Sequence, residues 1–273
     1  FNALFDDQGQ PHDDGKWSAR YNVTRRDQLA ALGIVFTALD ADAVLVVEAP
    51  DDNGRRSTVK ALESFAKLMQ LRARRALIGF ANDTQQELAL LYDPDVLTAR
   101  HDPQGATTAG GDMPPRFDGV FRIDLDIDDR ADRVEFSKPP LEVELTTISG
   151  RVIRLIGAHL KSKAPHGAVG RDEAIRIGIT NRRKQLAQAV WLRQRIEAHL
   201  VTDDSLIALM NTSIFSGARR SRLSWAKGKT QLPRSMIRMR AARFCSGLGW
   251  SIPRQGSTCA TSVGICRHCW ITS

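Results

Sequence analysis

The sequence predicts a mixed α/β (α+β) fold, in which helices alternate with short apolar strands. Two kinds of stretch carry this prediction. Continuous apolar runs such as 43–47 and 152–156 are typical of buried strands, whereas 181–200 repeats its apolar residues with the period of a helix. At 273 residues, the chain is long enough for one large domain or two small ones.

In the first third of the chain, each expected element has a local signal. Thr24 is a suitable N-cap for a helix. The apolar run that starts at Ala43 ends on Glu48, which either lies at a sheet edge or caps the next helix. The expected elements are a strand end over 1–5, helices over 17–40 and 57–71, and strands over 43–47, 77–80 and 87–92.

The pattern continues to residue 209. Residues 121–128 alternate between apolar and charged side chains, as half-buried strands do. Strands are also expected over 141–147 and 205–209, and the Gly- and Pro-rich 102–115 stretch is expected to be a loop. In the 181–200 helix, we expect Leu186, Ala189, Val190, Leu192 and Ile196 to face inward and Arg182, Arg183, Lys184, Arg193 and Arg195 to face outward.

An acidic series from Asp124 to Glu135 has the spacing of a calcium-binding loop. However, Asp129 occupies the position where such loops need glycine for a sharp turn. The residues before it alternate like a strand. We therefore interpret these acids as a solvated strand face and a hairpin turn.

Charge is divided unevenly along the chain. All 31 acidic residues lie at or before Asp204, and 205–273 holds all four cysteines, so the net charge of +8 comes from this end. The sequence therefore predicts a domain over 1–211, incomplete on its C-terminal side, and an anomalous basic Cys/Arg-rich tail over 212–273.

Three interpretations of the tail stay open. Its lack of periodicity and of acidic residues fits an out-of-frame translation of a normal C-terminus, or disorder. Its arginines also fit a nucleic-acid-binding arm. Zinc is the third interpretation, because Cys266 and Cys269 have ligand spacing. The other candidate zinc ligands are Cys245, Cys259 and His268.

The best functional candidate is the stretch 151–163. It begins as an apolar strand after a turn at Ser149-Gly150 and then presents His159, Lys161 and Lys163 at the strand's end. An imidazole and two ammonium groups at a sheet edge suit an anionic phosphate. The alternative is a core strand followed by a solvated basic loop.

Several short motifs, taken in order, resemble the endonuclease/exonuclease/phosphatase superfamily, which has the DNase-I-like fold. The resemblance covers 1–211. It implies a four-layer α/β/β/α sandwich of two mixed β-sheets with an active site at one edge, the last strands being missing or irregular here. The matching stretches are 1–2, 17–26, 41–48, 89–94, 137–141 and 157–163.

Carried over by position, this resemblance implies a Mg²⁺- or Mn²⁺-dependent site. Asn2 and Glu48 would hold the metal. His159 and Asn211 would be catalytic residues at the scissile phosphate, with Lys161 and Lys163 binding substrate phosphate. The family's orienting Asp and its terminal Asp-His pair have no counterpart in this sequence, so we expect low or no activity from this chain.

The expected function is therefore a nuclease- or phosphatase-type hydrolase that cleaves a phosphate ester, nucleic acid included, by in-line attack of water. The alternatives are a catalytically inactive remnant and a basic nucleic-acid-binding protein. No apolar run is long enough to span a bilayer, and no signal peptide is visible. Because the chain begins without Met, we expect a preceding segment; a cytoplasmic location is slightly favoured.

Overall fold

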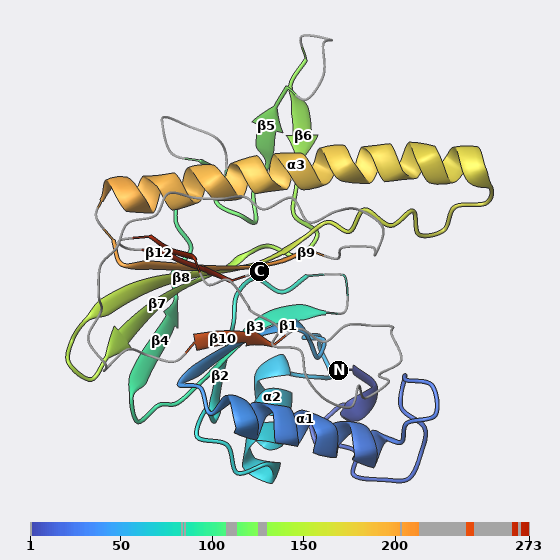
Figure 1. The fold of residues 1–273 in the computed structure, drawn as a ribbon, viewed down its shortest axis with the longest axis vertical. Coiled ribbons are helices and arrows are strands. Elements are labelled where there is room, and N and C mark those ends of the chain that lie inside the picture. Colours follow the sequence, from blue (N-terminus) through green and yellow to red (C-terminus); the bar gives the residue numbers. More distant parts are fainter. Residues whose placement is uncertain are drawn as a thin grey trace, which may run out of the picture.

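The computed structural model describes residues 2–82, 84, 86–107, 114–124, 130–202, 204–212, 239–242, 264–266 and 269–272. These residues form a mixed α+β fold with three α-helices and several open sheets, as the sequence predicts (Figure 1). The helices are α1 (Arg25–Leu39), α2 (Thr58–Leu68) and α3 (Arg171–Val201), preceded by the short 3-10 helix η1 (Asn2–Leu4).

The strands form two larger sheets and one hairpin. A four-stranded sheet has the order β10-β1-β3-β2, a six-stranded sheet has the order β11-β12-β9-β8-β7-β4, and β5 pairs with β6. The strand bounds are β1 Ala43–Ala49, β2 Arg75–Ile78, β3 Glu87–Tyr92, β4 Leu97–His101, β5 Phe121–Ile123, β6 Asp132–Val134, β7 Leu141–Thr147, β8 Val152–Leu160, β9 Leu206–Thr212, β10 Met239–Ala242, β11 Gly264–Cys266 and β12 Cys269–Thr272.

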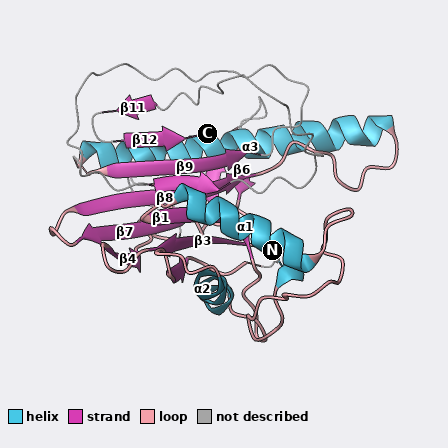
Figure 2. Ribbon diagram, turned by 60° about the horizontal axis from the view of Figure 1, so that its bottom comes forward, coloured by secondary structure: helices cyan, strands magenta, loops and turns pink. Residues whose placement is uncertain are grey.

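Three hydrophobic cores hold these elements together. One lies between α1, α2 and a face of the four-stranded sheet. A second lies between the two larger sheets, where β1 and β3 face β7, β8 and β9. The third joins the other face of the six-stranded sheet to α3 and the β5–β6 hairpin. Figure 2 shows α3 running roughly along the direction of β8 and β9.

Side-chain N-caps determine where α1 and α2 begin. The Thr24 side chain accepts a hydrogen bond from the Asp27 backbone N–H and Ser57 accepts one from Lys60, so Thr24 is the N-cap that the sequence predicts. Because Ser57 caps α2, Glu48 does not. The first helix is shorter than the expected 17–40, because Trp17 instead pairs with Thr24 in an isolated antiparallel bridge.

Helix α3 corrects the sequence prediction most. It begins at residue 171, ten residues before the predicted start. Arg195 was expected outside but is 0% exposed, whereas Leu186 was expected inside but is 58% exposed. The face that packs on the sheet therefore differs from the predicted one; its buried residues are Ala187, Gln188, Trp191, Leu192 and Arg195.

Smaller corrections concern strand limits. The expected strand end at 1–5 is a 3-10 helix, and the strand expected over 77–80 runs from Arg75 to Ile78. The strands over 87–92 and 141–147 are confirmed, and β4 and β6 were not predicted. The expected strand over 121–128 is described only to Ile123, since 125–129 lie outside the described residues, as does most of 212–273.

Candidate functional site

The ends of β8 and β9 bring two predicted site residues together. These strands are parallel, and His159 is directly opposite Asn211 in their register. Ile153 and Leu155 of β8 belong to the core between the sheets, so His159, at the same alternation, faces that side too. The same reasoning applies to Asn211, which follows Ile207 and Leu209 at alternate positions.

Gly157 lets the two sheets approach each other just before this edge. A Cβ atom at residue 157 would lie 2.5 Å from Cδ1 of Leu45 in β1, so only glycine fits here without displacing that side chain. Leu45 is three residues before Glu48, and Gly157 is two before His159. This close contact between the sheets therefore brings the end of β1 near the end of β8.

Glu48 has an unusual backbone at the end of β1. Its φ angle is 61°, in the left-handed region, and the pairing between β1 and β3 shifts register between Val47 and Ala49. Left-handed backbone costs a non-glycine residue roughly 1–2 kcal/mol, and such strain is concentrated at functional sites. The bulge turns Glu48 out of the regular alternation, and its side chain is half-buried.

His159 is held neutral at pH 7. Burial, together with the nearby charge of Lys138, lowers the pKa of His159 to about 4. Its Nδ1 atom is buried and has no hydrogen-bond partner among the described residues. A buried polar atom without a partner is uncommon, and a bound ligand is one physical reason for it.

Lys138 joins the two sides of the site. It precedes β7, its Nζ donates a hydrogen bond to Oε1 of Gln86, and burial lowers its pKa. The charges that act on it are those of Glu48, Glu87 and Lys161. No local pattern in the stretch 137–141 marks this lysine, because only the fold brings it to the ends of β1 and β8.

Glu87 is a second residue of this region that the sequence did not predict. This first residue of β3 is 1% exposed, and Nδ2 of Asn82 donates a hydrogen bond to its Oε2 at 2.6 Å. Burial raises the pKa of Glu87 to about 7, although backbone N–H groups of Asn82 and Asp52 act in the opposite direction. A glutamate at a strand start looks like an ordinary exposed residue in sequence, so no local pattern pointed to it.

The loop after β8 is fixed to α3 at its first residue. The Lys161 backbone N–H donates to Gln188 at 2.8 Å, and Gln185 donates to the Lys161 carbonyl oxygen at 2.8 Å. Lys161 directly follows the last residue of β8 and lies two residues after His159, and its charge acts on Lys138. Lys163 lies on the exposed side of the same loop.

Asn2 is described in its backbone only. It begins η1, and Arg56 donates hydrogen bonds to the carbonyl oxygens of Phe5 and Asp6 just after that helix. Arg56 belongs to the loop that follows β1, so the N-terminal segment lies beside the chain that leaves Glu48. The Asn2 side chain lies outside the described residues.

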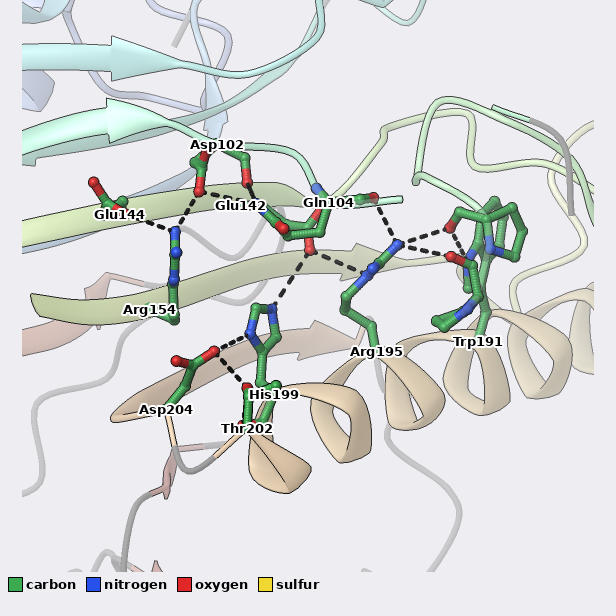
Figure 3. A network of polar contacts seen from close by, with 12 residues as sticks. Asp102, Gln104, Glu142, Glu144, Arg154, Trp191, Arg195, His199, Thr202 and Asp204 are labelled. Carbon is green, nitrogen blue, oxygen red and sulfur yellow. Dashed lines mark hydrogen bonds and ion pairs between the residues drawn. The ribbon is translucent and has the colours of Figure 1, made fainter. Parts of the chain in front are cut away.

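A second polar network lies where the C-terminal half of α3 meets Glu142 of β7 (Figure 3). The Nη2 atom of Arg195 donates to the carbonyl oxygens of Gln104, Pro114 and Pro115 at 2.7, 3.0 and 3.1 Å. Its Nε atom lies 3.2 Å from Oε1 of Glu142, a carboxylate that is 3% exposed. Arg195 thereby fastens both described ends of the 102–115 segment to α3.

His199 extends this network to the end of α3. Its Nδ1 lies 2.8 Å from Oδ2 of Asp204 and its Nε2 lies 4.0 Å from Oε1 of Glu142. Burial lowers the pKa of His199, but these two carboxylates outweigh burial and the pKa is raised overall. On β8, Arg154 pairs with Asp102 and Glu144. This network holds the loop and helix in place and is separate from the His159 edge.

Comparisons with known proteins assign the chain to no family. No protein-family model, no curated protein and no solved structure matches the chain. Within the described ranges, no group of three or more His, Cys, Asp or Glu side chains is placed to hold a metal ion. None of the described helices is long and apolar enough to cross a bilayer.

Proposed function

We propose that the protein is a metal-dependent phosphoesterase of the endonuclease/exonuclease/phosphatase type, with its site at the edge formed by Glu48, Lys138, His159 and Asn211. In this proposal, α1 with α2, the two larger sheets and α3 are the layers of one four-layer α/β/β/α sandwich. The observation that supports the proposal is the meeting of the end of β1 at Glu48 with the ends of β8 and β9 at His159 and Asn211, across the close contact of Gly157 with Leu45. Lys138, just before β7, acts electrostatically on His159 and is acted on by Glu48.

The residues at this edge suit a phosphate ester. Lys138 and Lys161 supply positive charge for its oxygens, and charge-assisted hydrogen bonds of this kind are stronger than neutral ones. His159, neutral at pH 7, offers an imidazole N–H to a phosphate oxygen without adding charge. The amide of Asn211, opposite His159, is a second neutral contact.

We further propose a hard divalent cation at this edge. Mg²⁺ commonly takes one or two carboxylates and keeps several waters, so it does not need a cluster of three acidic side chains. Glu48 would hold it, with Asn2 as the expected second ligand. When bound, the cation would stabilise negative charge on a phosphoryl oxygen and on the leaving group. The strained backbone of Glu48 is consistent with a carboxylate that is positioned for binding.

The test is hydrolysis of a phosphodiester, a phosphomonoester and plasmid DNA, each with Mg²⁺, with Mn²⁺ and with a chelator. We expect slow, metal-dependent cleavage of at least one of them, which Glu48→Gln and His159→Ala each lower by about 10²-fold or more. His166→Ala is the matched control, because His166 lies on the exposed part of the loop after β8.

Two results would contradict this proposal. If no substrate is cleaved with any metal, the result would favour a catalytically inactive remnant. DNA binding that weakens steeply with salt, without cleavage, would favour the nucleic-acid-binding protein.

A further inference from the structure

The N-terminal half of α3 has an apolar stripe that faces away from the sheets. Ile175, Ile179 and Leu186 are 52%, 50% and 58% exposed. Their spacings of four and seven residues place them on one side of the helix. Trp191 and Arg195, by which α3 packs on the body, lie on the opposite side. This helix is therefore apolar on two faces, of which the sheet covers one.

Arginines border this stripe. Arg182 lies on the stripe between Ile179 and Leu186, and Arg171 and Arg176 are exposed on either side of it. The acidic residues of this half, Asp172 and Glu173, lie in the first turn. Helices that lie in a membrane–water interface combine aliphatic side chains with Lys or Arg, and this half of α3 presents both on its exposed side.

The position of the stripe makes it accessible to a flat surface. Figure 1 shows the N-terminal half of α3 extending past the ends of the sheet strands, on the side where the chain leaves β8 for the helix. Asn181 ties this half to the preceding loop, since its Nδ2 donates to the Ala164 carbonyl oxygen at 2.9 Å. The exposed stripe is therefore presented on a fixed helix.

Two other occupants fit less well. A second copy of the chain would bring Arg182 and its counterpart together along the same stripe, and like charges at close range oppose that pairing. A nucleic acid would pair with the arginines, but its single strands are held by aromatic stacking and not by exposed isoleucines. Anionic lipid headgroups and acyl chains match both the arginines and the aliphatic side chains.

We propose that the N-terminal half of α3 docks the protein on an anionic lipid surface, with Ile175, Ile179 and Leu186 entering the headgroup boundary. Arg171, Arg176 and Arg182 would pair with lipid phosphates. This docking does not depend on phosphoesterase activity.

The experiment is co-sedimentation of the full chain with phosphatidylcholine vesicles, with and without phosphatidylserine. We expect binding that requires phosphatidylserine. Ile175→Gln/Ile179→Gln should weaken it about tenfold or more, because both aliphatic side chains are lost from the interface. Arg176→Gln/Arg182→Gln should weaken it about tenfold or more and reduce its dependence on lipid charge, with Arg171 retained.

The matched control is Ile148→Gln, since Ile148 is 78% exposed in the turn that precedes β8, whereas the N-terminal half of α3 follows the other end of that strand. It should bind as the wild type does. Circular dichroism checks that each variant keeps its helix, and the arginine pair gives an independent test if the isoleucine pair unfolds.

Three results would overturn the docking proposal. The first is absence of binding to phosphatidylserine vesicles. The second is equal binding by the isoleucine pair and the Ile148 control. The third is that the isoleucine pair dissociates a dimer, which would assign the stripe to a second copy of the chain. If vesicle binding is absent and the arginine pair lowers duplex DNA binding, the first result assigns the arginines to nucleic acid.

Discussion

Replacing Arg195 with methionine should destabilise the protein by about 3–5 kcal/mol, the usual cost of removing one partner from a buried ion pair. The substitution leaves the Glu142 carboxylate buried at 3% exposure without its guanidinium. It also removes the one donor that Gln104, Pro114 and Pro115 share. Because a domain is typically stable by only about 5–15 kcal/mol, this loss is large.

The protonation state of His199 should determine how large the destabilisation by Arg195→Met is. Its imidazole lies 4.0 Å from the same Glu142 oxygen and has a raised pKa. When protonated, it would partly neutralise the carboxylate that Arg195→Met leaves behind. The destabilisation should therefore be nearer the upper end of the range at high pH and nearer the lower end when His199 is charged.

Urea unfolding followed by far-UV circular dichroism measures this effect. Arg193→Met is the control, since Arg193 is 59% exposed and pairs with Glu197 at the helix surface, where such pairs contribute about 0.5 kcal/mol or less. The double variant Glu142→Leu/Arg195→Met should be more stable than Arg195→Met alone, because it leaves no unpaired charge buried. An Arg195→Met protein within about 1 kcal/mol of wild type would refute this reasoning.

Three further predictions concern the candidate site. In metal-free buffer, His159 stabilises the fold above pH 6.5 and loses this contribution as the pH falls through its pKa of about 4. Glu87 behaves in the opposite way: it stabilises the fold below pH 4.5 and loses this contribution as the pH rises through its pKa of about 7. Because a tenfold change in an acid dissociation constant corresponds to about 1.4 kcal/mol, each contribution is about 3 kcal/mol, and the two oppose each other. Relative to wild type, the unfolding free energy of His159→Gln should therefore fall as pH rises from 4.5 to 6.5, and that of Glu87→Gln should rise; parallel profiles would argue against both pKa changes. Glu48→Gly should be about 1 kcal/mol more stable than Glu48→Ala in urea unfolding, because only glycine takes a φ of 61° without strain, and equal stabilities would contradict the left-handed backbone. Gly157→Ala should lower the free energy of unfolding by about 1–3 kcal/mol, because the added methyl group overpacks against Leu45. Adding Leu45→Ala should recover part of that loss; if it recovers none, the close approach of the two sheets does not cause the loss.

The sequence predicted correctly those elements that depend on residues close together in the chain. Thr24 caps its helix because a threonine side chain can reach the first free N–H groups without help from the rest of the fold. The strand at 141–147 was predicted at its observed limits, because its apolar residues lie between a proline pair and a turn. The prediction of the buried face of α3 was wrong for a related reason. Both faces of this helix carry apolar residues, so periodicity alone could not tell which face meets the sheet.

The candidate site divides in the same way. His159 and Glu48 were chosen from sequence because each ends an apolar strand, and the fold puts them at neighbouring ends of two sheets. Lys138 and Glu87 were missed because no local pattern distinguishes a buried lysine or glutamate from an exposed one. Arg195 was predicted outside because arginines are seldom fully buried unless they are paired, and its partners are distant in sequence.

The sequence by itself therefore determined the mixed α+β class, most strands, the Thr24 helix cap and the strand-end histidine, because these depend on contacts between near neighbours in the chain. Tertiary structure alone decided which charges are buried, which face of α3 is covered, and that Lys138 lies between Glu48 and His159. Burial and pairing depend on which distant segments meet, and the close contact of Gly157 with Leu45 fixes that meeting at the candidate site.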